Sequence, residues 1–169
     1  MKNTQRVVAA IAGAVGLATV TSGAAWASTR PARPQTFVLY NAGSTFGGEN
    51  TVVASGAISG IGTERILTDN SSQGTQEFTS ELVFPDGTVT MDVHGSDTTT
   101  VDPRTCAGNV TGHVTWTITG GTGAYDGATG SGTGRYTDRF VLQRDANGCK
   151  EDAPVAQVFE AHERGTANV

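Results

Sequence analysis

The stretch from Val110 to Ile118 alternates between two kinds of residue. Its even positions read Val, Gly, Val, Trp and Ile, and its odd positions read Thr, His, Thr and Thr. A period of two sends successive side chains to opposite faces, which is typical of a β-strand with one buried face. No segment after residue 27 carries a helical repeat of any length. The pattern therefore predicts an all-β protein.

Similar alternation, interrupted by turn residues, predicts eight strands along the chain. Pro85-Asp86-Gly87 is typical of a tight turn, so the strands on either side of it are expected to form a hairpin. Residues 95–108 are expected to form the longest loop. Eight short, sequentially linked strands favour a small antiparallel eight-stranded β-barrel, with a two-sheet β-sandwich as the alternative. The predicted strands are 36–41, 51–58, 61–68, 76–84, 88–94, 110–119, 130–142 and 153–162.

The first 27 residues have the composition of a secretory signal peptide. Lys2 and Arg6 precede an apolar run over 7–20, and Ala25-Trp26-Ala27 forms a small-residue cleavage site. The apolar run is too short to span a membrane. We therefore predict a secreted, extracellular protein with a signal peptide at 1–27, a Pro-containing lead-in at 28–35 and a single barrel domain at 36–165.

Composition agrees with a β-protein, and the charge balance argues against one class of partner. From Ser28 onward, Gly, Thr and Ser make up 52 of 142 residues. Such a content also occurs in disordered chains, which have no reason to alternate. The same 142 residues hold 9 basic and 16 acidic side chains, which argues against a nucleic-acid partner. No second long apolar run follows, so no membrane insertion is expected, and a homo-oligomer is left open.

One segment resembles a known group of proteins. Residues 116–132 read WTITGGTGAYDGATGSG, similar to a Gly-rich segment of the allene oxide cyclase barrel-like superfamily, and VASGAISGIGTE at 53–64 resembles an early strand pair of its bacterial members. That superfamily includes plant allene oxide cyclases, dirigent proteins and small secreted bacterial proteins. The resemblance implies an antiparallel eight-stranded barrel with a central apolar cavity, often trimeric in the plant branch. It carries activity only by analogy, because no catalytic residue is matched.

Cysteine, histidine and glycine each suggest a chemistry that the spacing can test. Cys106 and Cys149 are the only cysteines and lack a Cys-x-x-Cys spacing, so in an exported chain they predict a structural disulfide. His94 and His113 fall on the polar faces of their strands, and His162 stands among glutamates, so we expect exposed histidines and no metal site. The glycines match no phosphate-binding motif. No cofactor is predicted.

The inward face of the strand at 130–142 supplies the candidate site. If Gly130, Gly132 and Gly134 point inward, Tyr136, Asp138 and Phe140 do so as well. Asp138 and Tyr136 are the candidate catalytic acid or base, although a bulge or an arginine partner at the rim would remove Asp138 from that role. Glycine at three alternate positions is expected to leave space near Tyr136 and Asp138. The predicted ligand-binding residues are Trp116, Phe78, Tyr136 and Phe140.

Three functions follow from these candidates. The first is binding of a small, mostly apolar molecule inside the barrel. The second is a cyclase or isomerase of the allene oxide cyclase or dirigent type, which positions a reactive substrate. The third is a structural protein of the cell envelope with a filled interior. Convergent ionisable groups in the interior would favour the enzyme, an apolar cavity would favour binding, and no cavity would favour the structural protein.

Overall fold

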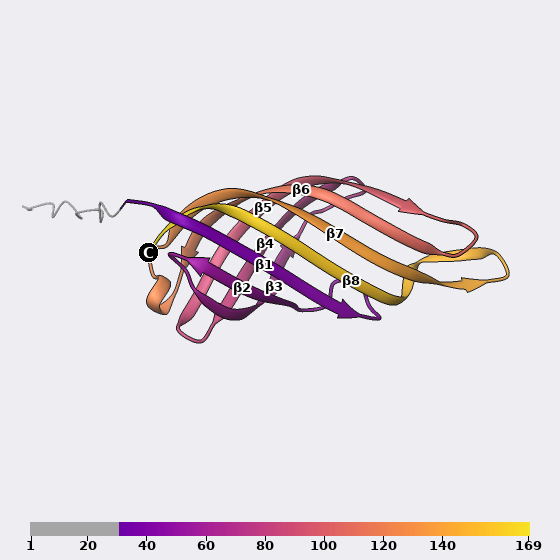
Figure 1. Cartoon of the computed structure of the whole chain (residues 1–169), viewed down its shortest axis with the longest axis horizontal. Helices are drawn as coiled ribbons and strands as arrows, with labels where there is room; N and C mark the ends of the chain where they lie inside the picture. Colours follow the sequence, from indigo (N-terminus) through magenta and orange to yellow (C-terminus); the bar gives the residue numbers. More distant parts are fainter. Residues whose placement is uncertain (1–30) are drawn as a thin grey trace, which may run out of the picture.

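The computed structural model describes residues 31–169, which form eight β-strands and one turn of 3-10 helix (Figure 1). The predicted signal peptide lies outside the described residues. Within them, no helix is long and apolar enough to cross a membrane. The elements are β1 (Arg33–Gly43), β2 (Asn50–Gly56), β3 (Gly60–Asp69), β4 (Thr75–Phe84), β5 (Gly87–Val101), β6 (Ala107–Gly121), η1 (Gly123–Tyr125), β7 (Thr129–Asp145) and β8 (Gly148–Asn168).

The eight strands form a closed antiparallel barrel. Each strand pairs with the next one in the chain, and β1 pairs with β8 over eleven residues, from Arg33 opposite Ala167 to Gly43 opposite Gln157. Closure leaves no open sheet edge, which is the advantage that a barrel has over a sandwich. The predicted barrel is therefore confirmed, and the sandwich alternative is wrong.

The barrel begins and ends beyond its predicted bounds. β1 starts at Arg33, inside the predicted lead-in, and Gln35 is buried there. The side chain of Gln35 accepts a hydrogen bond from Ile58 N at 2.9 Å and donates one to Ile58 O at 3.1 Å. A buried amide is retained only when such partners are present. At the other end, β8 continues to Asn168 and supplies buried Ala167 to the interior.

The prediction of a long loop at 95–108 was wrong. β5 continues to Val101 and β6 begins at Ala107, so only 102–106 form a turn. Thr98, Thr99 and Thr100 pair with Thr111, Val110 and Asn109. Threonine favours strands. Little of this run is buried, so both of its faces are polar and the sequence shows no alternation of apolar and polar residues.

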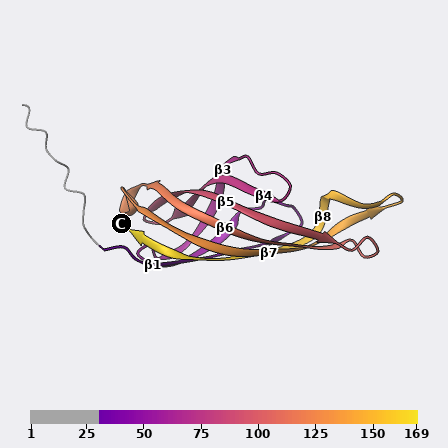
Figure 2. The same ribbon diagram turned by 90° about the horizontal axis from the view of Figure 1, so that it is seen from above.

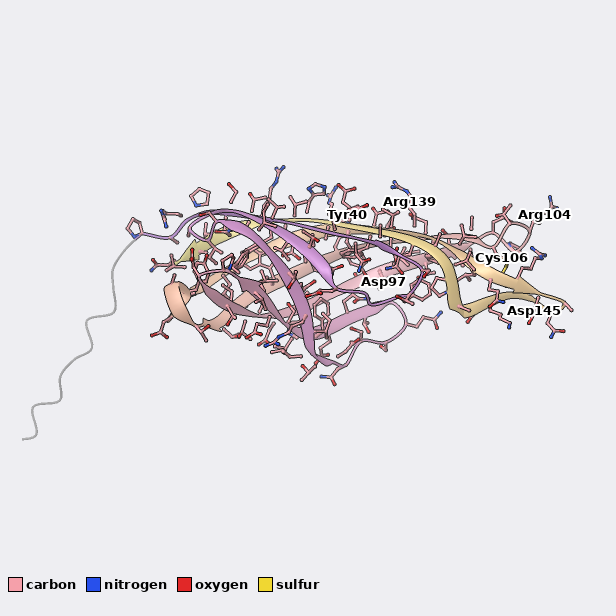
Figure 3. The ribbon with its side chains drawn as sticks, turned by 90° about the horizontal axis from the view of Figure 1, so that it is seen from below. Tyr40, Asp97, Arg104, Cys106, Arg139 and Asp145 are labelled. Atoms are coloured by element: carbon pink, nitrogen blue, oxygen red, sulfur yellow. A yellow bond between two sulfur atoms is a disulfide. The ribbon has the colours of Figure 1, made fainter. Side chains whose placement is uncertain are left out.

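The far ends of β5, β6, β7 and β8 project beyond the other four strands (Figures 1 and 2). We call this four-stranded projection the extension. The predicted disulfide between Cys106 and Cys149 joins its two hairpins, with 5.4 Å between the Cα atoms. Buried Phe140 and Leu142 pack around the bond, and Arg144 donates to Pro103 O at 3.1 Å. Figure 3 shows Cys106 inside the extension, with Arg104 and Asp145 further toward its tip.

The opposite end of the barrel is filled by apolar side chains. Trp116 is 1% exposed and meets Phe37 edge to face, with 5.5 Å between the ring centroids. Tyr125 of η1 covers this end and packs against Phe84 at 5.7 Å. We call this region the capped half. It also holds the buried side chains of Ile58, Leu82, Val89, Met91, Ile118 and Ala128.

Candidate functional site

A cavity of about 670 Å³ occupies the barrel between the capped half and the extension. Two connections border its mouth: 44–49 between β1 and β2, and 70–74 between β3 and β4. The first is held in place by Asn41, whose Nδ2 donates to Glu49 O at 3.1 Å. Cavities of this size accommodate drug-sized molecules. The barrel is therefore filled at one end and hollow toward the other.

Apolar side chains from six strands form a belt around the middle of the cavity. Phe159 and Tyr136 lie on neighbouring strands with 5.9 Å between their ring centroids, and Phe78 is half-buried on β4. Aromatic rings at such positions offer a large apolar contact area to a ligand. We call these residues the belt: Leu39, Phe78, Val93, Val114, Tyr136, Phe159 and Ala161.

Two glutamates lie below the belt. Glu163 pairs with Phe37 and Gly134, which places it at the boundary with the capped half, and it is 6% exposed. Glu64 is 7% exposed and accepts a hydrogen bond from Asn50 Nδ2 at 2.7 Å. Burial raises the pKa of both carboxyls. The nearby charge of Glu64 adds to the effect on Glu163, whose pKa reaches about 8.

Asp138 lies nearer the mouth, where the predicted acid was expected. The Asp138 residue as a whole is half-buried. One of its carboxyl oxygens, Oδ1, is fully buried and has no hydrogen-bond partner among the described residues. Burial raises the pKa of Asp138 to about 6. No bulge or rim arginine removes it from the interior, because it lines the cavity in phase with Tyr136. The carboxyl is therefore available to a molecule in the cavity.

The hydroxyl of Tyr136 is hydrogen-bonded to another acid, Asp97. Tyr136 Oη donates to Asp97 Oδ2 at 3.0 Å, and Gln76 Nε2 donates to the same oxygen at 2.7 Å. Burial raises the pKa of Tyr136, and the hydrogen bond and negative charge of Asp97 raise it further. Tyr136 is thus held as a neutral phenol, and Asp97 fixes the orientation of its ring beside the cavity.

Gln157 is a further polar group of the cavity wall. It is 6% exposed, and its Oε1 has no hydrogen-bond partner among residues 31–169. A buried acceptor without a donor costs stability, so such groups are rare unless a ligand or solvent satisfies them. Together with Asp138, it gives the outer part of the cavity two unsatisfied acceptor atoms.

The structure brings only some of the predicted ligand-binding residues together. Phe78 and Tyr136 line the cavity. Trp116 lies in the capped half, packed against Phe37, and Phe140 lies in the extension, where it meets Phe46 at 5.3 Å and packs beside the disulfide. The alternation correctly predicted that both aromatic side chains point inward. It does not predict where along the barrel axis the interior is hollow.

The glycines of β6 and β7 do not hollow out the cavity. A Cβ atom on Gly132 would lie 2.3 Å from the Trp116 ring, and one on Gly112 would lie 2.3 Å from the Tyr136 ring. Each aromatic ring therefore covers a glycine on the neighbouring strand. The expectation that the missing side chains create the space is therefore wrong, because the Trp116 ring lies opposite Gly132. The glycines admit the rings instead.

Sequence reasoning missed Glu64, Glu163 and Gln157. Glu163 follows Phe159 and Ala161 in the inward phase of β8, so that alternation was a usable signal. For Glu64 the pattern predicts the outer face, because apolar Ile61 lies on the opposite face of the strand and would be expected inside. Ile61 is instead 67% exposed, and a bulge follows at 66–68. An exposed isoleucine makes the outward phase of β3 look like the buried one.

The three histidines lie on the outer wall, as predicted. His94, His113 and His162 are exposed, and His162 Nε2 lies 2.7 Å from Glu160 Oε1. In residues 31–169, no group of three or more His, Cys, Asp or Glu side chains is arranged to hold a metal ion.

Comparisons with protein-family models, with curated proteins and with solved structures found no match to this chain. The resemblance in residues 116–132 therefore stays a prediction.

Proposed function

We propose that this protein binds one small, mostly apolar molecule in the barrel cavity. The observation that carries the proposal is the belt, which surrounds an open space of about 670 Å³ with apolar and aromatic side chains. Binding sites for small molecules are commonly apolar pockets with a few polar groups that orient the ligand. Here Asp138 and Gln157 supply such groups near the mouth.

The proposal can be tested by filling the cavity. Ala161 is a buried belt residue, so Ala161→Phe places a ring in the ligand space. Ala156 is exposed on the same strand, and Ala156→Phe is the matched control. Binding of the neutral fluorescent probe N-phenyl-1-naphthylamine should fall about ten-fold or more in Ala161→Phe and stay unchanged in the control. Equal binding by both variants, with circular dichroism showing intact folds, would overturn the proposal.

A second candidate function is an isomerase or cyclase. It is favoured by Asp138 and Tyr136, which both line the cavity, and by Asp97, which accepts the hydrogen bond of Tyr136. The pKa of Asp138 is raised to about 6. A carboxyl that titrates near neutral pH can take up and return a proton during an isomerisation. The resemblance of 116–132 to the allene oxide cyclase barrel-like superfamily supports the same candidate.

The enzyme candidate makes its own prediction. A small molecule extracted from the purified protein and returned to fresh protein should be converted to an isomer of equal mass and different chromatographic retention. Asp138→Asn should abolish this conversion, while Asp145→Asn in the exposed extension should leave it intact. Unchanged conversion in Asp138→Asn would remove Asp138 from the reaction.

Export completes the proposal. The disulfide and the lack of a membrane-spanning helix in residues 31–169 are compatible with a secreted protein. We expect cleavage after Ala27, so N-terminal sequencing of the extracellular form should begin at Ser28. An intracellular product that still begins at Met1 would contradict this expectation.

A further inference from the structure

We propose that the natural ligand is a cationic amphiphile, with an ammonium group held by the carboxyls of the cavity and an apolar body held by the belt. This inference rests on the proposed function and names the chemical class of its ligand. It follows from the hydrogen-bonding groups, the charges and the layout of the cavity.

The cavity has an excess of hydrogen-bond acceptors. Gln157 Oε1 and Asp138 Oδ1 are buried and unpartnered among residues 31–169. Glu163 is likewise 6% exposed, and no hydrogen bond to its carboxyl is present in that part of the chain. Gln157 is not acidic, so the acceptor excess does not depend on the carboxyls alone. A complementary ligand must bring donors, near the mouth for Gln157 and Asp138 and at the floor for Glu163. An ammonium group has donors and no acceptor.

The ionisable side chains along the cavity are acidic with one exception. Five carboxyls line it, and Arg65 is the one basic residue in its described lining. The Arg65 side chain is 64% exposed and pairs with Glu81, so it does not neutralise the interior. Charge of one sign along a cleft attracts ligands of the opposite sign. The five carboxyls belong to Glu49, Glu64, Asp69, Asp138 and Glu163.

The layout separates the polar and apolar parts of the ligand. Strand register places Glu163 level with Phe37 at the floor, Ala161 and Tyr136 one level higher, and Phe159 with Asp138 above them. An ammonium at the floor would meet Glu163 and Glu64, while its apolar body would lie along the belt toward the mouth. Charge-assisted hydrogen bonds in such a water-poor place are the strong ones.

Binding of an ammonium should release a proton from the protein. With its pKa at about 8, Glu163 is mostly protonated at pH 7 in the empty cavity. Glu64 faces it across the interior, whereas Phe37 and Gly134 beside it do not titrate. Asp138, Tyr136 and Asp97 lie nearer the mouth. An ammonium stabilises the ionised carboxyl, so amine affinity should rise between pH 7 and pH 8.5.

Three probes that share a naphthyl group test the inference: the cation 2-(1-naphthyl)ethylammonium, the neutral alcohol 2-(1-naphthyl)ethanol and the anion naphthalene-1-acetate, a carboxylate. Calorimetric titration of the purified disulfide-bonded protein should show the amine binding about ten-fold or more tightly than the alcohol, and the acetate most weakly. Only the amine should release protons, seen as a dependence of the heat on the ionisation enthalpy of the buffer.

A matched pair of variants identifies the groups responsible. Glu163→Gln should bring the affinities for the amine and the alcohol to within about three-fold of each other. Glu160→Gln, an exposed change on the same strand, should keep the preference for the amine. Loss of preference in both variants, or in neither, would contradict the assignment to Glu163.

The outcomes separate this inference from the proposed function. If all three probes bind equally well, or the acetate binds best, the cationic ligand is refuted and the apolar binding site stands. If none of the three binds to the folded protein, and N-phenyl-1-naphthylamine fails as well, the proposed function itself is refuted.

Discussion

The two halves of the barrel interior are built on the same strands, but one is filled by side chains and the other is hollow. In the capped half, Trp116, Phe37 and their neighbours fill the space, and η1 covers the end. In the cavity half, inward positions of the same strands carry Glu163, Asp138 and Gln157 around an open volume. We call this second region the cavity half. Closure of the sheet fixes which residues face inward, but the side chains at each level decide whether that level is a core or a site.

The difference also separates stability from function. Fully buried apolar side chains stabilise a fold, whereas buried carboxyls and unpaired acceptors destabilise it. The cavity half therefore costs stability that the capped half and the disulfide offset. Such a cost is typical of regions kept for binding or catalysis rather than for folding.

The largest expected effect comes from breaking the capped half. Trp116→Ala should lower the free energy of unfolding by about 3–5 kcal/mol, because it removes the largest fully buried side chain and leaves a void over Gly132. Urea denaturation measures the loss, with exposed Thr117→Ala as the control. A loss below about 1 kcal/mol would show that this half is not the core.

Removing the disulfide should have the next largest effect. The bond links residues separated by 43 positions, and its loss should cost about 4 kcal/mol through the entropy of the unfolded chain. Because the bond lies in the extension, hydrogen exchange in the Cys106→Ser, Cys149→Ser double variant should speed up first at the outer ends of β5 to β8. Unchanged exchange at the outer ends of β5 to β8 would contradict this local role.

In the cavity half, a smaller effect is expected from Glu163→Gln, which should make the protein less sensitive to rising pH instead of less stable. The pKa of Glu163 is raised in the folded state, so folding favours its protonated form. This contribution is fully present below the unfolded pKa and is lost as pH rises through about 8. Between pH 6 and pH 7.5, Glu163→Gln should therefore lose less unfolding free energy than the unaltered protein, by roughly 2 kcal/mol.

Urea denaturation of both proteins at the two pH values measures this difference. The exposed change Glu160→Gln is the control and should follow the unaltered protein. Parallel pH profiles for Glu163→Gln and the unaltered protein would mean that the Glu163 carboxyl is not desolvated.

Alternation was enough to predict the barrel and the inward faces of its central strands. It correctly sent Trp116 and Leu82 into the interior, because an antiparallel strand with one buried face keeps a strict period of two. It failed where neither face is buried, as in the Thr-rich end of β5. The extension was therefore missed, although its two cysteines correctly predicted the bond that joins it.

The candidate site could be predicted only in part. Asp138, Tyr136 and Phe78 were found because they share a phase with apolar or glycine positions. The level of each residue along the barrel depends on strand register, which pairs residues that are distant in the chain and is not visible in one sequence. For that reason Trp116 was expected at the ligand. Glu163 was missed for a different reason, because it lies just beyond the predicted strand at 153–162.

The most direct test of the account is native mass spectrometry of the protein purified from the culture medium of its own source. The unaltered protein should carry a non-covalent adduct of a small molecule, and that adduct should survive in Trp116→Phe, which preserves an aromatic core. It should be absent from Ala161→Phe, which fills only the cavity half. An adduct retained in Ala161→Phe, or a protein without any adduct that also fails to bind the naphthyl probes, would contradict the claim that this half of the barrel is a ligand site.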